Sequence, residues 1–290
     1  MRIAALATGA GVPAHDFAGR VIEVHKRAAL IKLHDGWCIT LLGRELGRQP
    51  RGISLDLPAD ISLQQLLSVD AELAKRSGVL RFAESALTID LRRALPWSSR
   101  IAAPQFDYRK AAVARAYRTA ASALERDGRS QGLRDVAGTK LDTLSKAIRD
   151  RDLSAAERAL ADLIGLGEGK TPAGDDYLVG ICAALWSCAA STAFAAALCP
   201  TLMTLAARSS DLSSLYLQEA ARGEISERLF DVAAGICAGG SDDVVGNAVT
   251  KALGVGHTSG AAGILGLLRG YADCTEAYQA SADSVLAPAF

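Results

Sequence analysis

The sequence predicts an α+β protein in which a small N-terminal antiparallel β domain, residues 1–103, precedes a larger and mainly helical domain, residues 104–290. Three observations support this prediction. Short runs of β-branched and large apolar residues alternate with turn residues before Pro104, and apolar residues recur at helical spacing after it. Half of the 290 residues are hydrophobic, which is enough for a sizeable core.

The N-terminal domain is expected to hold five to seven strands and one short helix. Asp35-Gly36 stands between two apolar runs and is typical of a hairpin, because both central residues of a type I′ turn need positive φ. We expect the strands within residues 20–25, 29–34, 37–42, 53–57, 79–82 and 86–91, and the helix within 62–68.

The C-terminal domain is expected to be built from helices that begin at polar caps. Ser154 with Glu157 has the spacing of a capping box, and Ser209-Ser210-Asp211 is interpreted as another cap. We expect helices within residues 108–126, 132–149, 154–164, 175–190, 195–208, 212–222, 226–238, 242–253 and 259–271.

Composition limits the classes of ligand and the compartment. The 32 basic residues balance the 32 acidic ones without a basic block, so nucleic acid is not an expected partner and a small molecule is. None of the six cysteines forms a Cys-x-x-Cys pair, which favours buried, reduced thiols. No signal peptide is apparent, so a cytoplasmic protein is expected.

Residues 177–207 contain no charged side chain, and this uncharged run is long enough to cross a membrane as a helix. The run is rich in Ala, Ser, Thr and Cys, contains Pro200, and has neither an aromatic belt nor a basic flank. We interpret it as two closely packed, Ala-rich core helices and expect no membrane association.

The loop from Gly165 to Gly174 is the densest cluster of glycines in the chain and leads onto a predicted helix. Glycines permit positive φ and close approach of the backbone to a ligand. A P-loop is excluded, because Ile164 stands where its first glycine belongs, a helix precedes the loop, and Pro172 follows Lys-Thr directly. The expected binding residues in this loop are Gly167, Gly169, Lys170, Thr171 and Gly174.

Asp175 and Asp176 follow this loop directly. Either acid alone is explained by helix capping or by the helix dipole. Two adjacent carboxylates before a long uncharged run are explained less well, because they repel one another unless a cation or several donors satisfy them. We therefore interpret both as candidate catalytic residues.

A second glycine-bracketed helix start occupies residues 254–260 and places an imidazole and two hydroxyls beside exposed backbone N–H groups. Such a segment suits a phosphate or carboxylate, and it equally fits an ordinary cap with a surface histidine. His257 is the catalytic candidate here, and the expected binding residues are Gly256, Thr258, Ser259 and Gly260.

The two motifs together resemble a bacterial family long catalogued as a domain of unknown function, which includes the AllH-type subunit of oxamate carbamoyltransferase from anaerobic allantoin breakdown. The resemblance covers mainly residues 160–270. The matching positions are Gly167, Gly169, Thr171, Pro172, Gly174, Asp175 and Asp176 in the first motif, and Gly256, His257, Ser259 and Gly260 in the second.

This resemblance implies a transferase subunit that converts oxalurate and phosphate to oxamate and carbamoyl phosphate, in purine catabolism. It also implies partner subunits or a homo-oligomer. No organic cofactor and no dedicated metal site are implied; phosphate or carbamoyl phosphate would be a substrate, and a divalent metal ion could accompany it.

Two positions depart from the family pattern. Lys170 stands where an apolar residue is expected, and Ala262 stands where an acid is expected. The alternative reading is a non-catalytic subunit that binds a small ligand or holds partners together. The glycine-rich polar loops favour the enzyme, whereas Ala262 and the lack of an evident nucleophile favour the alternative.

Overall fold

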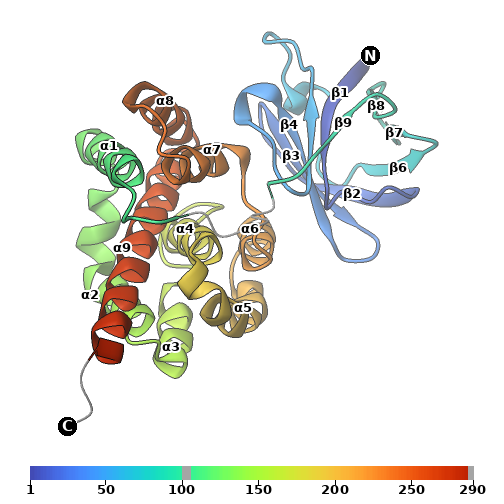
Figure 1. Cartoon of the computed structure of the whole chain (residues 1–290). Coiled ribbons are helices and arrows are strands. Elements are labelled where there is room, and N and C mark those ends of the chain that lie inside the picture. The colour runs from blue at the N-terminus through green and yellow to red at the C-terminus, as the bar shows by residue number, and fades with distance from the viewer. Residues whose placement is uncertain (100–105, 287–290) are drawn as a thin grey trace. The chain divides into compact units, whose positions relative to one another are not determined.

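The computed structural model describes residues 1–99 and 106–286, with side chains described as far as residue 275 (Figure 1). The chain divides into two compact units, Met1–Ser99 and Arg100–Phe290. The expected boundary between residues 103 and 104 lies outside the described residues.

The N-terminal unit is a sheet whose strands follow the order β5-β4-β3-β2-β6-β7-β8-β1-β9, with an additional pairing of β5 with β1. That pairing closes the sheet into a barrel. The strands are β1 (Arg2–Gly9), β2 (Phe17–Val24), β3 (Ala28–Leu33), β4 (Cys38–Gly43), β5 (Gly52–Leu55), β6 (Glu72–Arg76), β7 (Val79–Phe82), β8 (Thr88–Asp90) and β9 (Leu95–Trp97). Short 3₁₀ turns lie at Arg44–Leu46 and Leu63–Gln65.

The expected α+β class is confirmed. The expected antiparallel domain of five to seven strands is corrected to a barrel in which nine strands are described and the pairing is mixed. β1 runs parallel to both β8 and β9, and β4 runs parallel to β5. The contacts of β1 join segments far apart in the sequence, and β4 and β5 are consecutive strands joined without a hairpin. Local turn signals, which report only neighbouring hairpins, therefore do not predict them.

The Asp35-Gly36 hairpin forms between β3 and β4, where Lys32 pairs with Cys38. Gly36 has a φ of 89°, but Asp35 is not among the described residues with positive φ. The connection is thus a longer loop than a type I′ turn. Trp37 N donates to Asp35 Oδ1 at 3.1 Å, and this side-chain contact stabilises the turn instead.

A buried lysine ties the start of the barrel together. Lys75 on β6 is 6% exposed, and its Nζ donates to the carbonyl oxygens of Pro13, Ala14 and His15 at 2.9, 2.7 and 3.0 Å. Burial lowers the pKa of Lys75. The three acceptors use all three ammonium donors, so this polar group is satisfied inside the barrel.

The C-terminal unit is helical, and each expected helical segment corresponds to a helix among the described residues. The expected cap at Ser154 is wrong, because Asp152 caps this helix through Ala155 N at 2.9 Å. The helices are α1 (Ala111–Asp127), α2 (Gln131–Arg149), α3 (Leu153–Leu163), α4 (Ala173–Ser187), α5 (Thr192–Leu205), α6 (Asp211–Ala221), α7 (Glu227–Cys237), α8 (Asp242–Leu253) and α9 (Ser259–Leu286), with 3₁₀ turns at Ala189–Ser191 and Ala206–Arg208.

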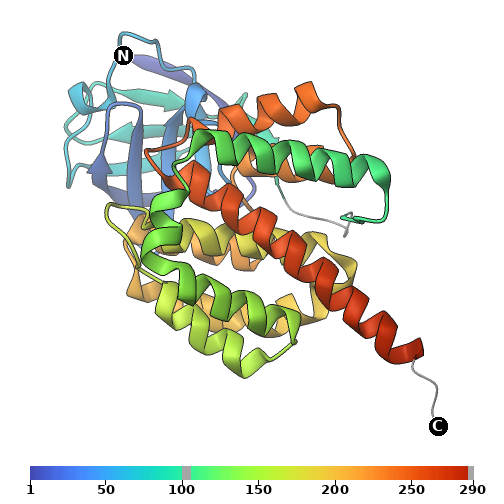
Figure 2. The same cartoon turned by 90° about the vertical axis from the view of Figure 1, so that its left-hand side faces the viewer.

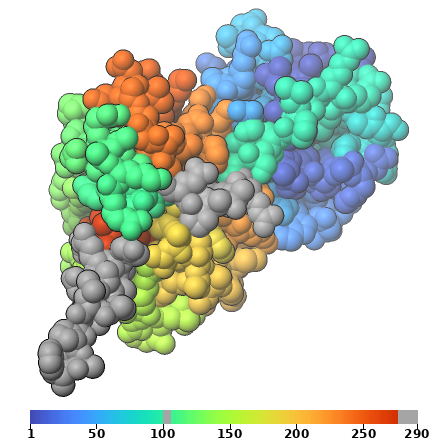
Figure 3. Space-filling model, viewed as in Figure 1, coloured from blue at the N-terminus to red at the C-terminus, as the bar shows by residue number. Residues whose placement is uncertain are grey.

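α9 organises this unit. It lies between α2 and α4, and both Figure 1 and Figure 2 show it alongside α1 and α2. On the surface, α1 and α8 lie side by side (Figure 3). Arg115 of α1 contributes to this contact, because its Nη2 donates to the carbonyl oxygens of Gly239 and Gly240 at 3.2 and 3.3 Å.

The uncharged run forms α4 and α5, two helices separated by a 3₁₀ turn. By length and composition, Ala189–Arg208 would be long enough and apolar enough to cross a membrane, with a mean hydropathy of 1.5. One such helix is weak evidence for a membrane span, because the core helix of a soluble protein can have the same length and composition. α5 turns Phe194, Leu198 and Leu202 into the core and exposes small residues such as Ala196 and Ala197.

Candidate functional site

The two glycine-rich loops lie at the same end of a parallel pair of helices. Asp176 lies against Gly263, and further along Ala184 lies against Gly270, so the contacts advance in the same direction on α4 and α9. A Cβ at Gly180 would lie 2.1 Å from Gly263 O, so any residue other than glycine would clash at this position. Glycine at the crossing therefore permits the close approach that brings both helix starts together.

Parallel packing places two positive helix ends side by side, each equivalent to about half an elementary charge. Such an arrangement is unfavourable unless negative charge lies near it. Asp175 and Asp176 in the first turn of α4 supply that charge, and a bound anion would do the same.

Positive φ values shape the first loop at Gly165, Gly167 and Gly169, where φ is 75°, 116° and 91°. Gly174 fits against the end of α3, since a Cβ there would lie 2.2 Å from Leu163 O. Residues 167–170 are exposed. The loop thus presents backbone to solvent while both its ends are fixed.

Asp175 is buried and fully bonded to protein donors. Its Oδ1 accepts from Gly165 N at 2.7 Å, and its Oδ2 accepts from the Ser213 hydroxyl at 2.6 Å and from the Ser209 hydroxyl. The carboxylate therefore connects the first loop to the start of α6. Both oxygens of Asp175 are engaged by protein donors, which favours a positioning role over direct contact with a ligand.

Asp176 has a different environment. Its Oδ2 is buried and has no hydrogen-bond partner. Burial raises the pKa of Asp176 to about 7, and the charge of Asp175 acts in the same direction, whereas hydrogen bonding to Ser259 and Thr171 lowers it. A carboxyl group that titrates near neutrality can accept or donate a proton at physiological pH.

The hydroxyls beside Asp176 come from both loops. Thr171 Oγ1 lies 2.8 Å from Ser259 Oγ, which joins the loop before α4 to the first residue of α9. The structure therefore brings Thr171, Asp176 and Ser259 together. They form a cluster of one carboxyl and two hydroxyl groups, in which Asp176 Oδ2 has no hydrogen-bond partner.

Backbone donors at the start of α4 are mostly used within the protein. Gly174 N donates to Leu166 O at 2.8 Å, and the amides of Asp175 and Asp176 both donate to Pro172 O, at 2.9 and 3.1 Å. An anion at this end would thus be held by the helix dipoles, the hydroxyls and the exposed loop 167–170, and not by the first amides of α4.

The remaining predicted residues lie around this cluster. His257 is exposed, and its carbonyl accepts from Arg129 Nη1 at 3.2 Å. Thr258 O accepts from Ala262 N at 2.9 Å in the first turn of α9. Gly256 has a φ of 62°, and a Cβ at Gly260 would lie 2.0 Å from Ala252 O. Both glycines are therefore required by the turn itself.

Two features of the site escaped the sequence analysis. Tyr216 on α6 lies near Asp176, and burial together with the Asp176 charge raises its pKa, which keeps its hydroxyl protonated as a donor. Ser210 caps α6 as expected, through Ser213 N at 3.1 Å, but Ser209 and Ser213 bind Asp175. The cluster of serines around residue 210 was a visible signal, whereas nothing marked Tyr216.

The possible metal ligands in this cluster are oxygen atoms. Across residues 1–99 and 106–275, no three His, Cys, Asp or Glu side chains lie together in an arrangement that could hold a metal ion. The oxygen donors at the site are Asp176, Thr171 and Ser259. Hard cations such as Mg²⁺ prefer oxygen donors and are commonly bound by one carboxylate together with substrate phosphates and water.

Comparison with known proteins identifies the segment that carries the site. Residues 163–271 match the model of the family described as oxamate carbamoyltransferase subunit AllH. No curated protein and no solved structure matches the chain. The matched segment contains both loops, α4, α6 and the packed part of α9. The match confirms the family resemblance for residues 163–271.

Proposed function

We propose that the chain is a cytoplasmic subunit of a carbamoyltransferase that acts with partner subunits on a small ureido acid and phosphate. The reaction would convert oxalurate and phosphate to oxamate and carbamoyl phosphate. The family match supports the subunit role. The observation that carries the proposal of a site is Asp176, whose buried Oδ2 lacks a partner at the meeting point of both loops.

In this proposal the substrate anions bind at the paired starts of α4 and α9. The two helix dipoles favour negative charge there. One hydroxyl of the Thr171–Ser259 pair donates to the other, which leaves one O–H to donate to an oxyanion oxygen. A divalent cation accompanying the phosphate would be held by Asp176 and these hydroxyls. Asp175 keeps the first loop in place through its bonds to Gly165, Ser209 and Ser213.

Asp176 has the proton affinity that the transfer requires. A phosphate oxygen attacks the ureido carbonyl carbon, a C–O bond forms, and the C–N bond to the oxamate nitrogen breaks. The proton of monohydrogen phosphate must reach the departing nitrogen. A carboxyl group with a pKa of about 7 accepts that proton from phosphate and donates it to nitrogen.

The direct test is a carbamoyl phosphate assay of the purified chain, alone and with the products of neighbouring genes. Asp176→Asn should lower kcat by about 10²- to 10⁴-fold, the usual contribution of general acid–base catalysis. Asp243→Asn is the matched control, because Asp243 is also the second of two aspartates in a first helical turn but is exposed. Equal activity of both variants would refute the catalytic role of Asp176.

A non-catalytic subunit is the second candidate, and Ala262 favours it. This residue stands where the family resemblance leads us to expect an acid, and it is 2% exposed in the core. If the chain binds oxalurate or phosphate without turnover, and full activity of the assembly survives Asp176→Asn, the chain is a ligand-binding or scaffolding subunit.

A further inference from the structure

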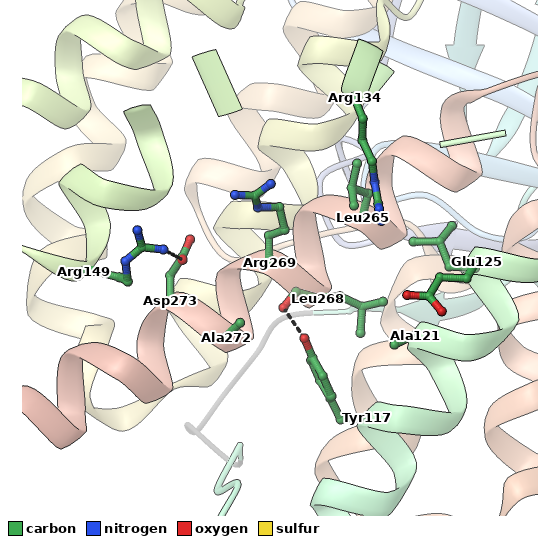
Figure 4. A pocket seen from close by; sticks show the side chains of 11 residues that line it. Tyr117, Ala121, Glu125, Arg134, Arg149, Leu265, Leu268, Arg269, Ala272 and Asp273 are labelled. Atoms are coloured by element: carbon green, nitrogen blue, oxygen red, sulfur yellow. Dashed lines mark hydrogen bonds and ion pairs between the residues drawn. The ribbon is translucent and has the colours of Figure 1, made fainter. Parts of the chain in front are cut away.

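A cavity lies in the helical unit between α1, α2 and α9, and none of the residues that line it belongs to the two loops. It has a volume of about 270 Å³ and extends along α9 from Leu265 to Asp273 (Figure 4). Eight residues of helix correspond to about 12 Å. The cavity lies just below the usual range for drug-sized ligands, about 300–1,000 Å³, and thus fits a smaller molecule.

Arginines dominate the polar lining of this cavity. Arg134 and Arg149 come from α2, and Arg269 comes from α9. Figure 4 shows Arg269 between Arg134 and the ion pair of Arg149 with Asp273, whose Nη1–Oδ1 distance is 3.0 Å. Arg269 donates through Nη2 to Asp142 at 2.7 Å, and one such partner leaves other guanidinium donors for a ligand.

Two groups that line the cavity keep an unpaired buried atom: Asp273, whose Oδ2 has no partner although Oδ1 binds Arg149, and Arg134. Its Nε is buried and has no hydrogen-bond partner. A buried donor without an acceptor is costly, and buried donors in proteins are nearly always paired. Glu125 on α1 also lines the cavity, but it is exposed and no ion pair joins it to Arg134. An incoming anion would supply the acceptor that the protein does not.

The other walls are apolar. Ala121 and Leu124 from α1 face Leu265 and Leu268 from α9. A ligand with a short hydrocarbon body would bury that body against these side chains while its head group binds arginine. A carboxylate matches the planar guanidinium fork in a bidentate geometry.

We propose that this cavity binds a small organic carboxylate, whose head group is held by Arg134 and Arg269 and whose apolar body packs on Leu265 and Leu268. This site is separate from the loops before α4 and α9, and it does not depend on the proposed carbamoyl transfer.

The test follows the Arg134 Nε–H resonance of the full-length chain by NMR while butyrate, acetate, inorganic phosphate or chloride is added at matched ionic strength. The resonance is assigned by its loss in Arg134→Lys. Butyrate should shift it in a saturable manner and bind more tightly than acetate, because only butyrate carries the apolar body. Chloride should have no saturable effect.

Arg134→Gln should weaken butyrate binding, measured by calorimetry, by about 10- to 100-fold, the loss expected for hydrogen bonds to a charged group. Arg126→Gln is the charge-matched control, since Arg126 is exposed on α1 and does not line the cavity, and it should bind normally. Glu125→Gln should strengthen binding by removing a nearby negative charge.

Two results would overturn the proposal. One is the absence of saturable butyrate binding. The other is equal destabilisation of the chain by Arg134→Gln and Glu125→Gln, together with unchanged butyrate affinity, which would mean that these two residues pair with each other in solution. Phosphate binding that is lost in Ser259→Ala but kept in Arg134→Gln would belong to the loop site and would support the separation of the two sites.

Discussion

Thr171 Oγ1 and Ser259 Oγ lie 2.8 Å apart, although the two residues are separated by 88 positions in the chain. Their contact joins the two glycine-rich loops directly above the parallel starts of α4 and α9. Asp176 lies beside this pair, and hydrogen bonding to both hydroxyls counteracts the effect of burial on its pKa. The hydroxyl pair therefore joins the two loops and limits the rise in the pKa of Asp176 that burial causes.

Removing one hydroxyl should raise the pKa of Asp176. In Ser259→Ala the carboxylate loses the hydrogen bond that lowers its pKa most, so the pKa should rise above about 7. A ¹³C-NMR titration of the aspartate carboxyl carbons measures this directly. Ser241→Ala is the control, because Ser241 is an ordinary cap that accepts from Val244 N at 3.4 Å on α8. An unchanged Asp176 titration in Ser259→Ala would contradict this interpretation.

Asp176→Asn should stabilise the fold at neutral and alkaline pH. The pKa of Asp176 is raised from 3.8 to about 7, so its contribution to stability is greatest below pH 4 and is lost as the pH rises through 7. The variant lacks this loss and should be more stable than the wild type at pH 8 by up to about 2–4 kcal/mol. Urea denaturation at pH 5 and pH 8 measures the difference. A variant that is less stable at pH 8 would show that the carboxylate is satisfied when ionised.

Asp175→Asn should have the opposite effect on stability. Three donors bind the Asp175 carboxylate, and an amide NH₂ group cannot accept from the donors that face it. We expect a loss of about 2–4 kcal/mol in the free energy of unfolding, because buried donors are left unpaired. The exposed Asp243→Asn should change stability by less than about 1 kcal/mol. If Asp175→Asn is as mild as this control, the carboxylate does not connect the first loop to α6.

Gly180→Ala should separate α4 from α9 and disturb the site from a distance. The added Cβ would lie 2.1 Å from Gly263 O, so the helices must move apart. We expect a loss of several kcal/mol, typical of overpacking against backbone, and weaker phosphate binding at the loops. Gly138→Ala is the control, because a Cβ on this α2 glycine would meet nothing within 4 Å. It should be neutral or stabilising by up to about 1 kcal/mol, from helix propensity alone.

Lys75→Met should destabilise the barrel. The substitution keeps an unbranched side chain that is one heavy atom shorter and removes the ammonium group that binds three carbonyl oxygens. A loss of about 2–4 kcal/mol is expected in thermal or urea unfolding. Lys26→Met, at an exposed position, should change stability by less than about 0.5 kcal/mol. Equal effects of the two substitutions would mean that water replaces Lys75 at little cost.

Local features of this protein could be predicted from its sequence. The nine helical segments follow from apolar spacing and caps, because helical hydrogen bonds join residues four apart and their signal is local. The density of glycines likewise indicated both loops. Gly167, Gly169 and Gly256 have positive φ, a conformation that favours glycine. The closure of the barrel by β1 was not predicted, because its partners β5, β8 and β9 are distant in the chain.

The environments of the acidic residues could not be predicted from local sequence patterns. The pairs Asp175-Asp176 and Asp242-Asp243 look alike in sequence, as two acids in the first turn of a helix. Asp243 is exposed, Asp175 is held by three donors, and Asp176 is buried with an oxygen unpaired. These differences arise from α6 and α9 packing around the start of α4. The electrostatics of a carboxyl group depend on its surroundings in space, and no local pattern in the chain specifies them.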